Sequence, residues 1–175
     1  ASREVTIPLA FSKCEETGRY TNFTRSALML ELGKNPSLKN NPAYAEVANG
    51  VKVEGYSFGD TDVYKTIEGA SYLLQTYPDK KLMKYIDSVL VVVAAAQEPD
   101  GYLNTSRTMN PKHPHEWMGS ERWEKVEDLS HEFYNLGHMA ESAVAHYQAT
   151  GERTFLDITT RYADCIIRDV GDKPG

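Results

Sequence analysis

Two helical hairpins that follow one another along the chain constrain the fold more than any other feature of this sequence. Within them, apolar residues recur every three or four positions, the spacing that places them on one face of a helix. Pro78 lies between the helices of the first hairpin and Gly151 between those of the second, where each favours a turn. We therefore predict an all-α fold with four helices, at 60–76, 80–97, 131–150 and 152–170.

The second hairpin repeats the first after about seventy residues. This shift places Asp60 on Ser130 and Tyr64 on Tyr134, and repeats of this size are typical of solenoids and toroids. The turns within the hairpins are short, whereas the connections outside them are long. Stacked hairpins then gather the long loops at one end, where a rigid scaffold often positions functional residues. An α/α toroid and a straight solenoid both fit this layout.

The rest of the chain is predicted to hold one further helix and two long loops. The helix covers 3–18 and ends at Gly18, and a short helix is possible at 22–32. Residues 33–59, with several Asn, Pro and Gly, and the polar residues 98–129 read as loops. The functional end of the molecule should hold both loops and the N-termini of the first helix of each hairpin.

Composition excludes several classes of partner. The 175 residues carry a formal net charge of −6 with scattered basic residues, so we expect binding neither to nucleic acid nor to an anionic membrane. The longest apolar run, 89–96, is too short to span a bilayer. No signal peptide is visible at Ala1, and we read 1–175 as a mature or trimmed segment of one domain whose compartment is left open.

The segment from Ser130 to His138 carries the most chemistry. It is not a zinc-protease HExxH motif, because the second histidine comes three residues too late. On a helix, His131, Asn135, His138 and Ser142 form one stripe, which predicts the wall of a wet cavity. In the first turn His131 would be a neutral imidazole that hydrogen-bonds a sugar hydroxyl, because the helix dipole disfavours a cation there. The alternative is a surface or capping histidine.

Other polar and aromatic residues at the same end are candidates for binding a sugar. They are Asp60, Asp62, Gln97, Asp100, Tyr102, Trp117 and Trp123. Some of these residues have a simpler interpretation. Asp60 and Asp62 could cap the 60–76 helix, and Asp100 lies in a Pro-Asp-Gly turn at 99–101. His113 and His115 could bind a metal, but no further ligand lies near them in the sequence. We therefore predict no metal site in this chain.

Three segments stand out as motifs: YKTIEGASY at 64–72, AAAQEPDGYL at 94–103 and SHEFYNLGHM at 130–139. A fourth, AVAHYQATG, continues the pattern at 143–151. In this order and spacing the sequence resembles glycoside hydrolase family 127, the β-L-arabinofuranosidase family, over essentially its whole length. His131 matches the family's histidine at the start of this helix, which we expect to line the sugar subsite.

The resemblance implies an (α/α)6 barrel of which 1–175 is an incomplete, N-terminal portion, completed by the remainder of the parent polypeptide. It implies a retaining glycosidase that releases non-reducing β-L-arabinofuranosyl units, or a related unusual sugar, from a plant-type glycan or oligosaccharide. It also implies a cysteine nucleophile, a glutamate acid/base and a zinc ion, all held by motifs further along the family's chain. Neither Cys14 nor Cys165 stands in such a motif, so we expect this chain alone to be inactive and to bind no zinc.

Two other functions are left open by the residues themselves. An epimerase or an unsaturated-uronide hydrolase shares the toroid by analogy, and a non-enzymatic helical-repeat module would bind a protein partner. Repeat scaffolds usually keep short loops on both faces. The 98–129 loop, with two tryptophans and two histidines, therefore favours an enzyme.

Overall fold

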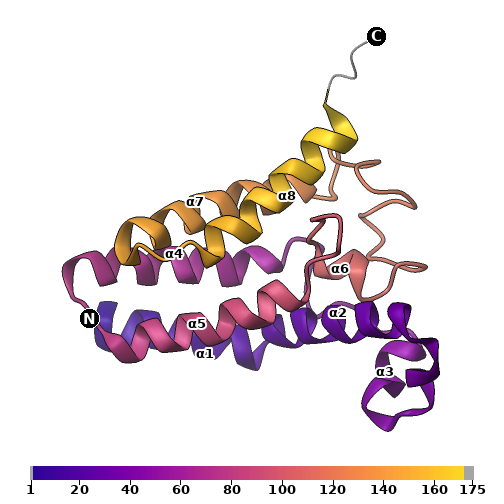
Figure 1. Cartoon of the computed structure of the whole chain (residues 1–175), viewed down its shortest axis with the longest axis horizontal. Helices are drawn as coiled ribbons and strands as arrows, with labels where there is room; N and C mark the ends of the chain where they lie inside the picture. Colours follow the sequence, from indigo (N-terminus) through magenta and orange to yellow (C-terminus); the bar gives the residue numbers. More distant parts are fainter. Residues whose placement is uncertain (1, 172–175) are drawn as a thin grey trace.

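The computed structural model describes residues 2–171, a range that contains helices and loops but no strand (Figure 1). The elements in chain order are the π-helical turn η1 (Ser2–Thr6), α1 (Ile7–Glu16), α2 (Arg19–Lys34), the 3-10 turns η2 (Pro36–Asn40) and η3 (Pro42–Tyr44), α3 (Ala45–Ala48), α4 (Asp60–Thr76), α5 (Lys80–Ala95), α6 (Thr105–Thr108), α7 (Glu132–Thr150) and α8 (Thr154–Val170). The predicted all-α class is confirmed.

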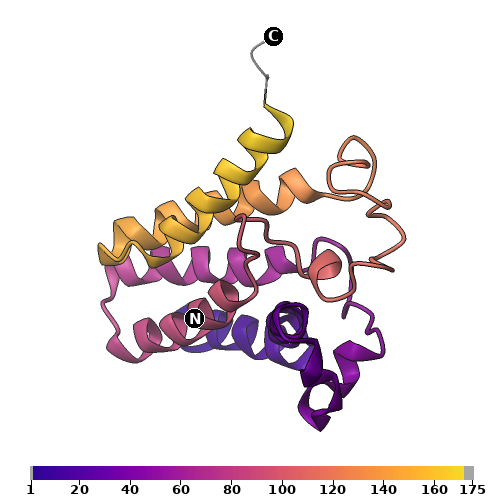
Figure 2. The same cartoon turned by 45° about the vertical axis from the view of Figure 1, so that its right-hand side comes forward.

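Helices α4 and α7 lie side by side and run in the same direction, as Figures 1 and 2 show. Helix α8 packs against α7 in the same layer, while α1, α2 and α5 form a second layer. The N-termini of α4 and α7 both meet the long connection between α5 and α7. This confirms the predicted arrangement, in which the first helices of the two hairpins open at the same end as the 98–129 loop.

Helix α8 illustrates how the apolar pattern builds the core between the layers. Phe155, Ile158, Tyr162 and Cys165 recur every three or four residues and are all buried. The turn before α8 uses Gly151, whose φ of 76° ends α7 in the left-handed conformation that glycine adopts without strain. Each hairpin is therefore specified locally by its turn and by its apolar stripe.

Burial in α4 and α7 repeats after seventy-two residues. Asp60 and Glu132 begin the two helices and are both buried, and Ile67 corresponds to Met139 in the same way. The predicted match of Asp60 with Ser130 is therefore wrong by two residues. The shift of seventy residues aligns side chains of similar type, such as Tyr64 and Tyr134. It does not align the buried faces of the two helices, which match after seventy-two residues.

The N-terminal region departs most from the prediction. The helix expected at 3–18 begins as the π-helical turn η1 and continues as α1. Gly18, with a φ of 73°, leads directly into α2 and does not start a loop. Helix α2 is longer than the predicted 22–32, because it packs against α5 and α6, and such tertiary packing stabilises helices whose own pattern is weak.

The loop expected at 33–59 contains the short elements η2, η3 and α3. Asn35 and Asn41 start the two 3-10 turns, and their side chains accept hydrogen bonds from the backbone N–H groups of Ser37 (3.3 Å) and Ala43 (3.0 Å). Elsewhere the helix ends shift by one or two residues: α5 ends at 95, α7 begins at 132 and α8 begins at 154. The 98–129 loop contains one short helix, α6.

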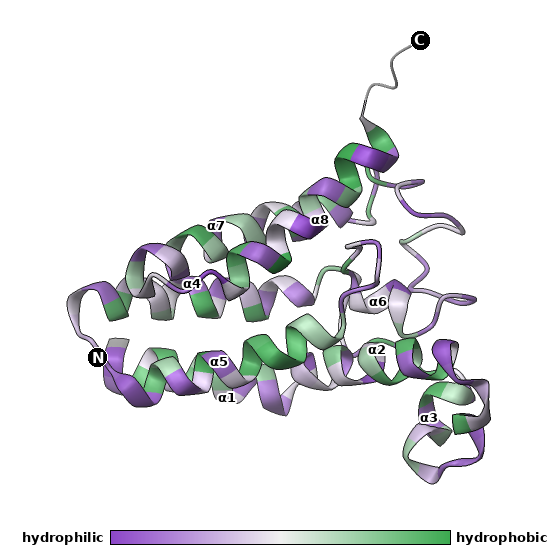
Figure 3. Cartoon of the chain, viewed as in Figure 1, coloured by the Kyte–Doolittle hydropathy of each residue, from purple (hydrophilic) through white to green (hydrophobic). Residues whose placement is uncertain are grey.

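Apolar residues are most continuous along α5, as the colouring of Figure 3 shows. The inward face of this helix holds Ile86, Val89, Leu90 and Val93. Within residues 2–171, no helix combines the length and the apolar character that crossing a membrane requires.

Candidate functional site

Two buried carboxylates hold the long α5–α7 connection against the helix N-termini. Asp60, the first residue of α4, is 2% exposed. Its carboxylate accepts hydrogen bonds from the backbone N–H of Thr105 (2.9 Å) and from the Thr105 hydroxyl. These bonds fix the start of α6 beside the start of α4.

Glu132, the first residue of α7, is the second anchor and is fully buried. Its carboxylate accepts hydrogen bonds from the Tyr102 hydroxyl (2.7 Å), the Trp123 backbone N–H (3.1 Å) and the Ser130 hydroxyl (3.0 Å). The Nε of Arg107 lies 3.9 Å from the same carboxylate. One side chain thus joins the beginning and the end of the loop to the helix.

The Arg107 guanidinium extends this framework into the loop. It donates hydrogen bonds to the carbonyl oxygens of Met118 (2.8 Å), Ser120 (3.1 Å) and Glu121 (2.9 Å). A planar guanidinium that satisfies several carbonyls fixes a loop that has no regular structure of its own. The loop is therefore a built surface, which is what a binding site on a helical scaffold requires.

Burial raises the pKa of Asp60 to about 6, against the opposing effect of its hydrogen bonds from Thr105. The folded state therefore takes up the proton at a higher pH than the unfolded chain, where an aspartate titrates near ~4. The contribution of Asp60 to the free energy of unfolding is then fully present below ~4 and is lost as the pH rises through about 6.

We expect the Asp60→Asn variant of the full-length protein to lack this pH dependence. Between pH 4 and 6 the wild type should lose stability relative to the variant, by up to about 1.4 kcal/mol per pH unit. The measurement is the midpoint of urea unfolding for both proteins across this range. Parallel profiles would contradict the assignment of a raised pKa to Asp60.

Next to this framework lies a partly exposed group of rings that we call the aromatic platform: Tyr56, Phe58, Trp117, His131 and Tyr134. The Tyr56 ring stacks on both Phe58 and Trp117 with centroids 5.4 Å apart in each pair. Phe58 lies 4.6 Å from the imidazole of His131, which lies 5.5 Å from Tyr134. Tyr56 and Tyr134 are 54% and 40% exposed, so the platform offers ring surface to solvent.

His131 has both an unusual backbone and a defined tautomer. Its φ of 57° lies in the left-handed region, which only one other non-glycine residue of 2–171, Trp123, shares. Such outliers tend to lie at functional sites. Its Nδ1 bonds the carbonyl oxygen of Leu129, and because a carbonyl only accepts, Nδ1 carries the proton. In the neutral ring Nε2 is then a hydrogen-bond acceptor.

The prediction that His131 lies in the first turn of the helix is wrong. Helix α7 begins at Glu132, and His131 precedes it in the left-handed conformation. The reason is that the chain must bring both the hydroxyl of Ser130 and the carboxylate of Glu132 into the buried anchor. His131, between these two buried residues, is thereby turned toward the platform.

The predicted polar stripe along α7 is divided by burial. Asn135 and Ser142 are buried: the Asn135 amide donates to the carbonyl oxygen of Ser57 (3.5 Å), and the Ser142 hydroxyl donates to the carbonyl oxygen of Tyr64 in α4 (2.7 Å). His138 stays on the open side, with its ring 4.4 Å from that of Tyr134. The stripe therefore does not line a single solvent-filled cavity. Its buried members instead form hydrogen bonds with backbone groups of neighbouring segments, as buried polar side chains usually do.

Three residues predicted to bind sugar are buried in structural contacts. Asp60 is the anchor described above. The Gln97 amide nitrogen donates to the carbonyl oxygens of Gly101 and Ile158, both at 2.9 Å. Tyr102 is fully buried with its hydroxyl on the Glu132 anchor. These contacts give all three a role in holding the loop.

Two predicted aspartates form ion pairs away from the platform. Asp62 is exposed and pairs with Arg19 at 2.7 Å. Asp100 pairs with Arg122 at 2.6 Å and with Arg168 at 3.5 Å, and the Arg122 guanidinium beside it helps to lower the pKa of Asp100, against the effect of burial. The structure does not bring either residue to the exposed rings.

The two tryptophans have different roles. Trp117 belongs to the platform. Trp123 packs against the rings of Tyr102 (5.3 Å) and Phe133 (5.6 Å), and its indole N–H donates to Asp169 at 3.1 Å. Of the predicted sugar-binding residues, the structure therefore brings together His131 and Trp117.

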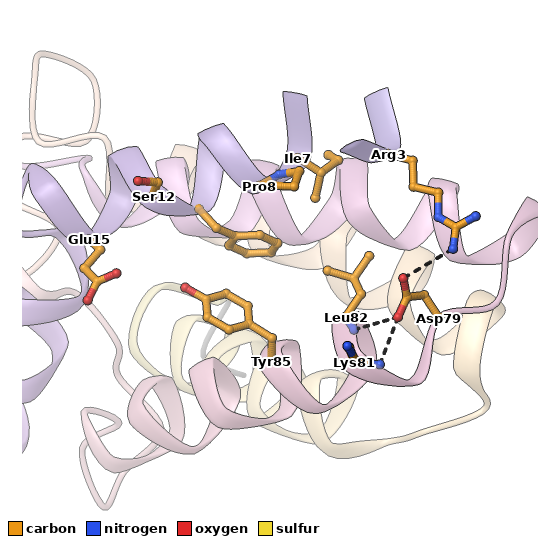
Figure 4. Close-up of a pocket in the computed structure, with 10 residues that line it drawn as sticks. Arg3, Ile7, Pro8, Ser12, Glu15, Asp79, Lys81, Leu82 and Tyr85 are labelled. Atoms are coloured by element: carbon orange, nitrogen blue, oxygen red, sulfur yellow. Dashed lines mark hydrogen bonds and ion pairs between the residues drawn. The ribbon is translucent and has the colours of Figure 1, made fainter. Parts of the chain in front are cut away.

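A separate cavity of about 400 Å³ opens between α1 and α5, at the far end of the helices (Figure 4). Phe11, Leu82 and Tyr85 give it a mainly apolar lining, and Arg3 pairs with Asp79 at 3.7 Å on its edge. The charges of Arg3 and Asp79 are thus used by each other, and we assign the cavity no function.

The chain matches the GH127 catalytic domain of β-L-arabinofuranosidases over residues 1–175. It belongs to this family. A non-reducing end β-L-arabinofuranosidase of Bifidobacterium longum subsp. longum is 36% identical over 121 residues, which cover 69% of this chain and 18% of the relative. The GH127 membership makes the helical layers part of an (α/α) barrel.

Two solved GH127 structures have the same fold. The β-arabinofuranosidase BT3674 is 69% identical with a TM-score of 0.85, covering 99% of this chain and 24% of its own. Ara127N-Se, a β-L-arabinofuranosidase from Geobacillus stearothermophilus T6, is 33% identical with a TM-score of 0.75, covering 99% and 25%. This GH127 chain thus spans a quarter or less of the length of these relatives.

The zinc ion that the GH127 resemblance implies has no ligand set in this part of the chain. No group of three or more His, Cys, Asp or Glu side chains comes together within residues 2–171, whereas zinc sites use at least three protein ligands. The Nδ1 of His115 already accepts the Trp117 backbone N–H (3.2 Å). Cys14 and Cys165 are buried free thiols. We derive no step through a metal in this segment.

Several residues of the site were not predicted from the sequence. Tyr56, Phe58 and Tyr134 form most of the platform. Lys65 donates a hydrogen bond to the Tyr134 hydroxyl (2.6 Å) and lies 4.8 Å from the ring centre. Glu132 is the main anchor. The one available signal was the aromatic pair in Tyr56-Ser57-Phe58, close before α4.

Proposed function

We propose that the full-length protein is a retaining glycosidase that releases β-L-arabinofuranosyl units from the non-reducing ends of glycans, and that this segment forms part of its terminal sugar subsite. GH127 membership supports the activity, as do relatives that are themselves β-L-arabinofuranosidases. Because the chain spans 18% to 25% of those relatives, the activity is proposed for the whole protein.

One observation carries the subsite: the His131 imidazole, in which Nε2 is the free acceptor, packs against the rings of Phe58 and Tyr134 in the aromatic platform. A sugar offers hydroxyl groups around an apolar C–H face. Sites that combine a ring surface with a few fixed polar groups suit such ligands. In this proposal His131 accepts a hydrogen bond from a sugar hydroxyl, and Phe58 and Trp117 contact the sugar face.

The catalytic groups are proposed to lie in the remainder of the polypeptide. They are the cysteine nucleophile, the glutamate acid/base and the zinc ion that the family resemblance implies. This segment then binds and orients the terminal sugar for those groups. Correct orientation of bound reactants accounts for a large part of enzymatic rate enhancement, so a binding segment contributes to the turnover number as well as to affinity.

We expect the purified full-length protein to hydrolyse an aryl β-L-arabinofuranoside. An aryl α-L-arabinofuranoside and an unsaturated-uronide disaccharide should react about 100-fold more slowly or not at all, because the site discriminates by transition-state binding. Initial rates of aryl alcohol or sugar release measure this. Proton NMR of the first-formed sugar should show retention of configuration. Preferential cleavage of the uronide, or inversion, would contradict the proposal.

A further inference from the structure

A cavity of about 500 Å³ lies beside the aromatic platform, between the chain segments 51–55 and 106–116. Its lining includes Val51, Lys52, Ser106, His113, His115 and Glu116. Ligand pockets of small molecules span roughly 300–1,000 Å³, so the cavity has the size of a sugar-binding pocket. Of its lining residues, only His115 takes part in a contact described above, the hydrogen bond from the Trp117 backbone N–H.

The chemistry of the lining matches a polyhydroxylated ligand. Lys52 supplies a donor and Glu116 an acceptor, the imidazole of His113 can act as either, and Val51 adds apolar surface. Sugar hydroxyls both donate and accept hydrogen bonds, whereas an apolar or a purely ionic ligand would leave part of this lining unused. The lining therefore favours a sugar unit.

Ser106 provides an independent indication of a ligand. Its side chain is 2% exposed, and its hydroxyl has no hydrogen-bond partner among residues 2–171. Buried polar side chains in native proteins are nearly always hydrogen-bonded. A partner for this hydroxyl must therefore come from outside residues 2–171, and a molecule bound in the cavity is one that can supply it.

Two residues on the cavity wall lie next to residues of the platform. The His115 imidazole, on the cavity wall, lies 5.0 Å from the ring of Trp117 and accepts its backbone N–H. Gly55, also on the wall, directly precedes Tyr56. A glycan bound at His131 and Phe58 would therefore reach the cavity by crossing the stacked rings of Tyr56 and Trp117.

We propose that this cavity, which we call the Ser106 cavity, binds the second sugar unit of the substrate, on the polymer side of the terminal unit. The proposal rests on the proposed function, since it assumes that the terminal unit occupies the platform. It assigns specificity for oligosaccharides to the segments 51–55 and 106–116. An aryl arabinofuranoside has one sugar unit and would leave the cavity without a sugar.

The test compares Ser106→Ala and Lys52→Ala with wild type in the full-length protein. The substrates are a β-linked arabinofuranosyl disaccharide and an aryl β-L-arabinofuranoside. In each variant the ratio of the disaccharide KM to the aryl-glycoside KM should rise about three- to tenfold, the effect of one lost hydrogen bond.

Thermal unfolding should not change in Ser106→Ala, because the hydroxyl has no protein partner to lose. Lys112→Ala, next to the cavity but not in its lining, is the control and should match wild type in both KM values.

Titration calorimetry with a thio-linked disaccharide, which is not hydrolysed, separates this proposal from the proposed function. If the wild type cleaves neither substrate, the proposed function fails, and calorimetry alone decides the role of the cavity. Three- to tenfold weaker binding to Ser106→Ala and Lys52→Ala supports the Ser106 cavity. Equal binding to wild type and both variants, or an unchanged KM ratio, would overturn it.

Discussion

Replacing Glu132 with alanine is expected to destabilise this segment by about 3–5 kcal/mol, the cost of breaking a buried, hydrogen-bonded charge network. The change leaves the Tyr102 hydroxyl and the Trp123 backbone N–H without their acceptor. It also leaves Arg107 buried beside a site that has lost its negative charge. The long α5–α7 connection should therefore detach from the start of α7.

Hydrogen exchange of the full-length variant is the measurement, because it reports local opening within a larger protein. Amides of residues 98–129 should exchange faster in Glu132→Ala. The factor should correspond to most of the expected loss of about 3–5 kcal/mol in local stability. In Glu132→Gln, which keeps one acceptor oxygen, the exchange rates should lie between those of Glu132→Ala and those of the wild type. Glu127→Ala, exposed in the same loop, is the control. Wild-type protection in Glu132→Ala would show that Glu132 is not the anchor.

The hairpin helices could be predicted because their ends are encoded nearby. Helix α4 covers the predicted 60–76, since an acidic first turn and the Tyr77-Pro78 pair mark its two ends. Helix α2 has no comparable signals: its apolar pattern is weak, and contacts with α5 and α6 determine its length. Local rules therefore predicted the helices whose two ends are marked by neighbouring residues.

The candidate site was predicted only in part for a related reason. His131 and Trp117 were found from residue type and motif, but Phe58 and Tyr134 join them only through packing. The left-handed backbone of His131 follows from the buried anchors on either side of it, which periodicity does not reveal. Tyr102, which was expected to bind sugar, is buried because its hydroxyl completes that same anchor.

Replacing His131 with glycine is expected to lower kcat/KM about tenfold or more while leaving stability nearly unchanged. Glycine adopts a φ of 57° readily. Relief of the left-handed strain offsets the added flexibility of the unfolded chain and the loss of the exposed hydrogen bond from Nδ1 to Leu129, so stability should change by less than about 1 kcal/mol. The sugar loses its hydrogen bond to Nε2, worth about 0.5–1.5 kcal/mol or more if the partner is left buried. A bond that strengthens in the transition state appears in kcat as well as in KM.

The most direct test of the account is kcat/KM of full-length His131→Gly on an aryl β-L-arabinofuranoside, measured together with the melting temperature. Glu127→Gly controls for an added glycine in the same loop. We predict that His131→Gly loses about tenfold or more of its activity at a wild-type melting temperature, while Glu127→Gly keeps both. Wild-type activity in His131→Gly, or a loss that follows unfolding alone, would contradict the placement of the terminal sugar at His131.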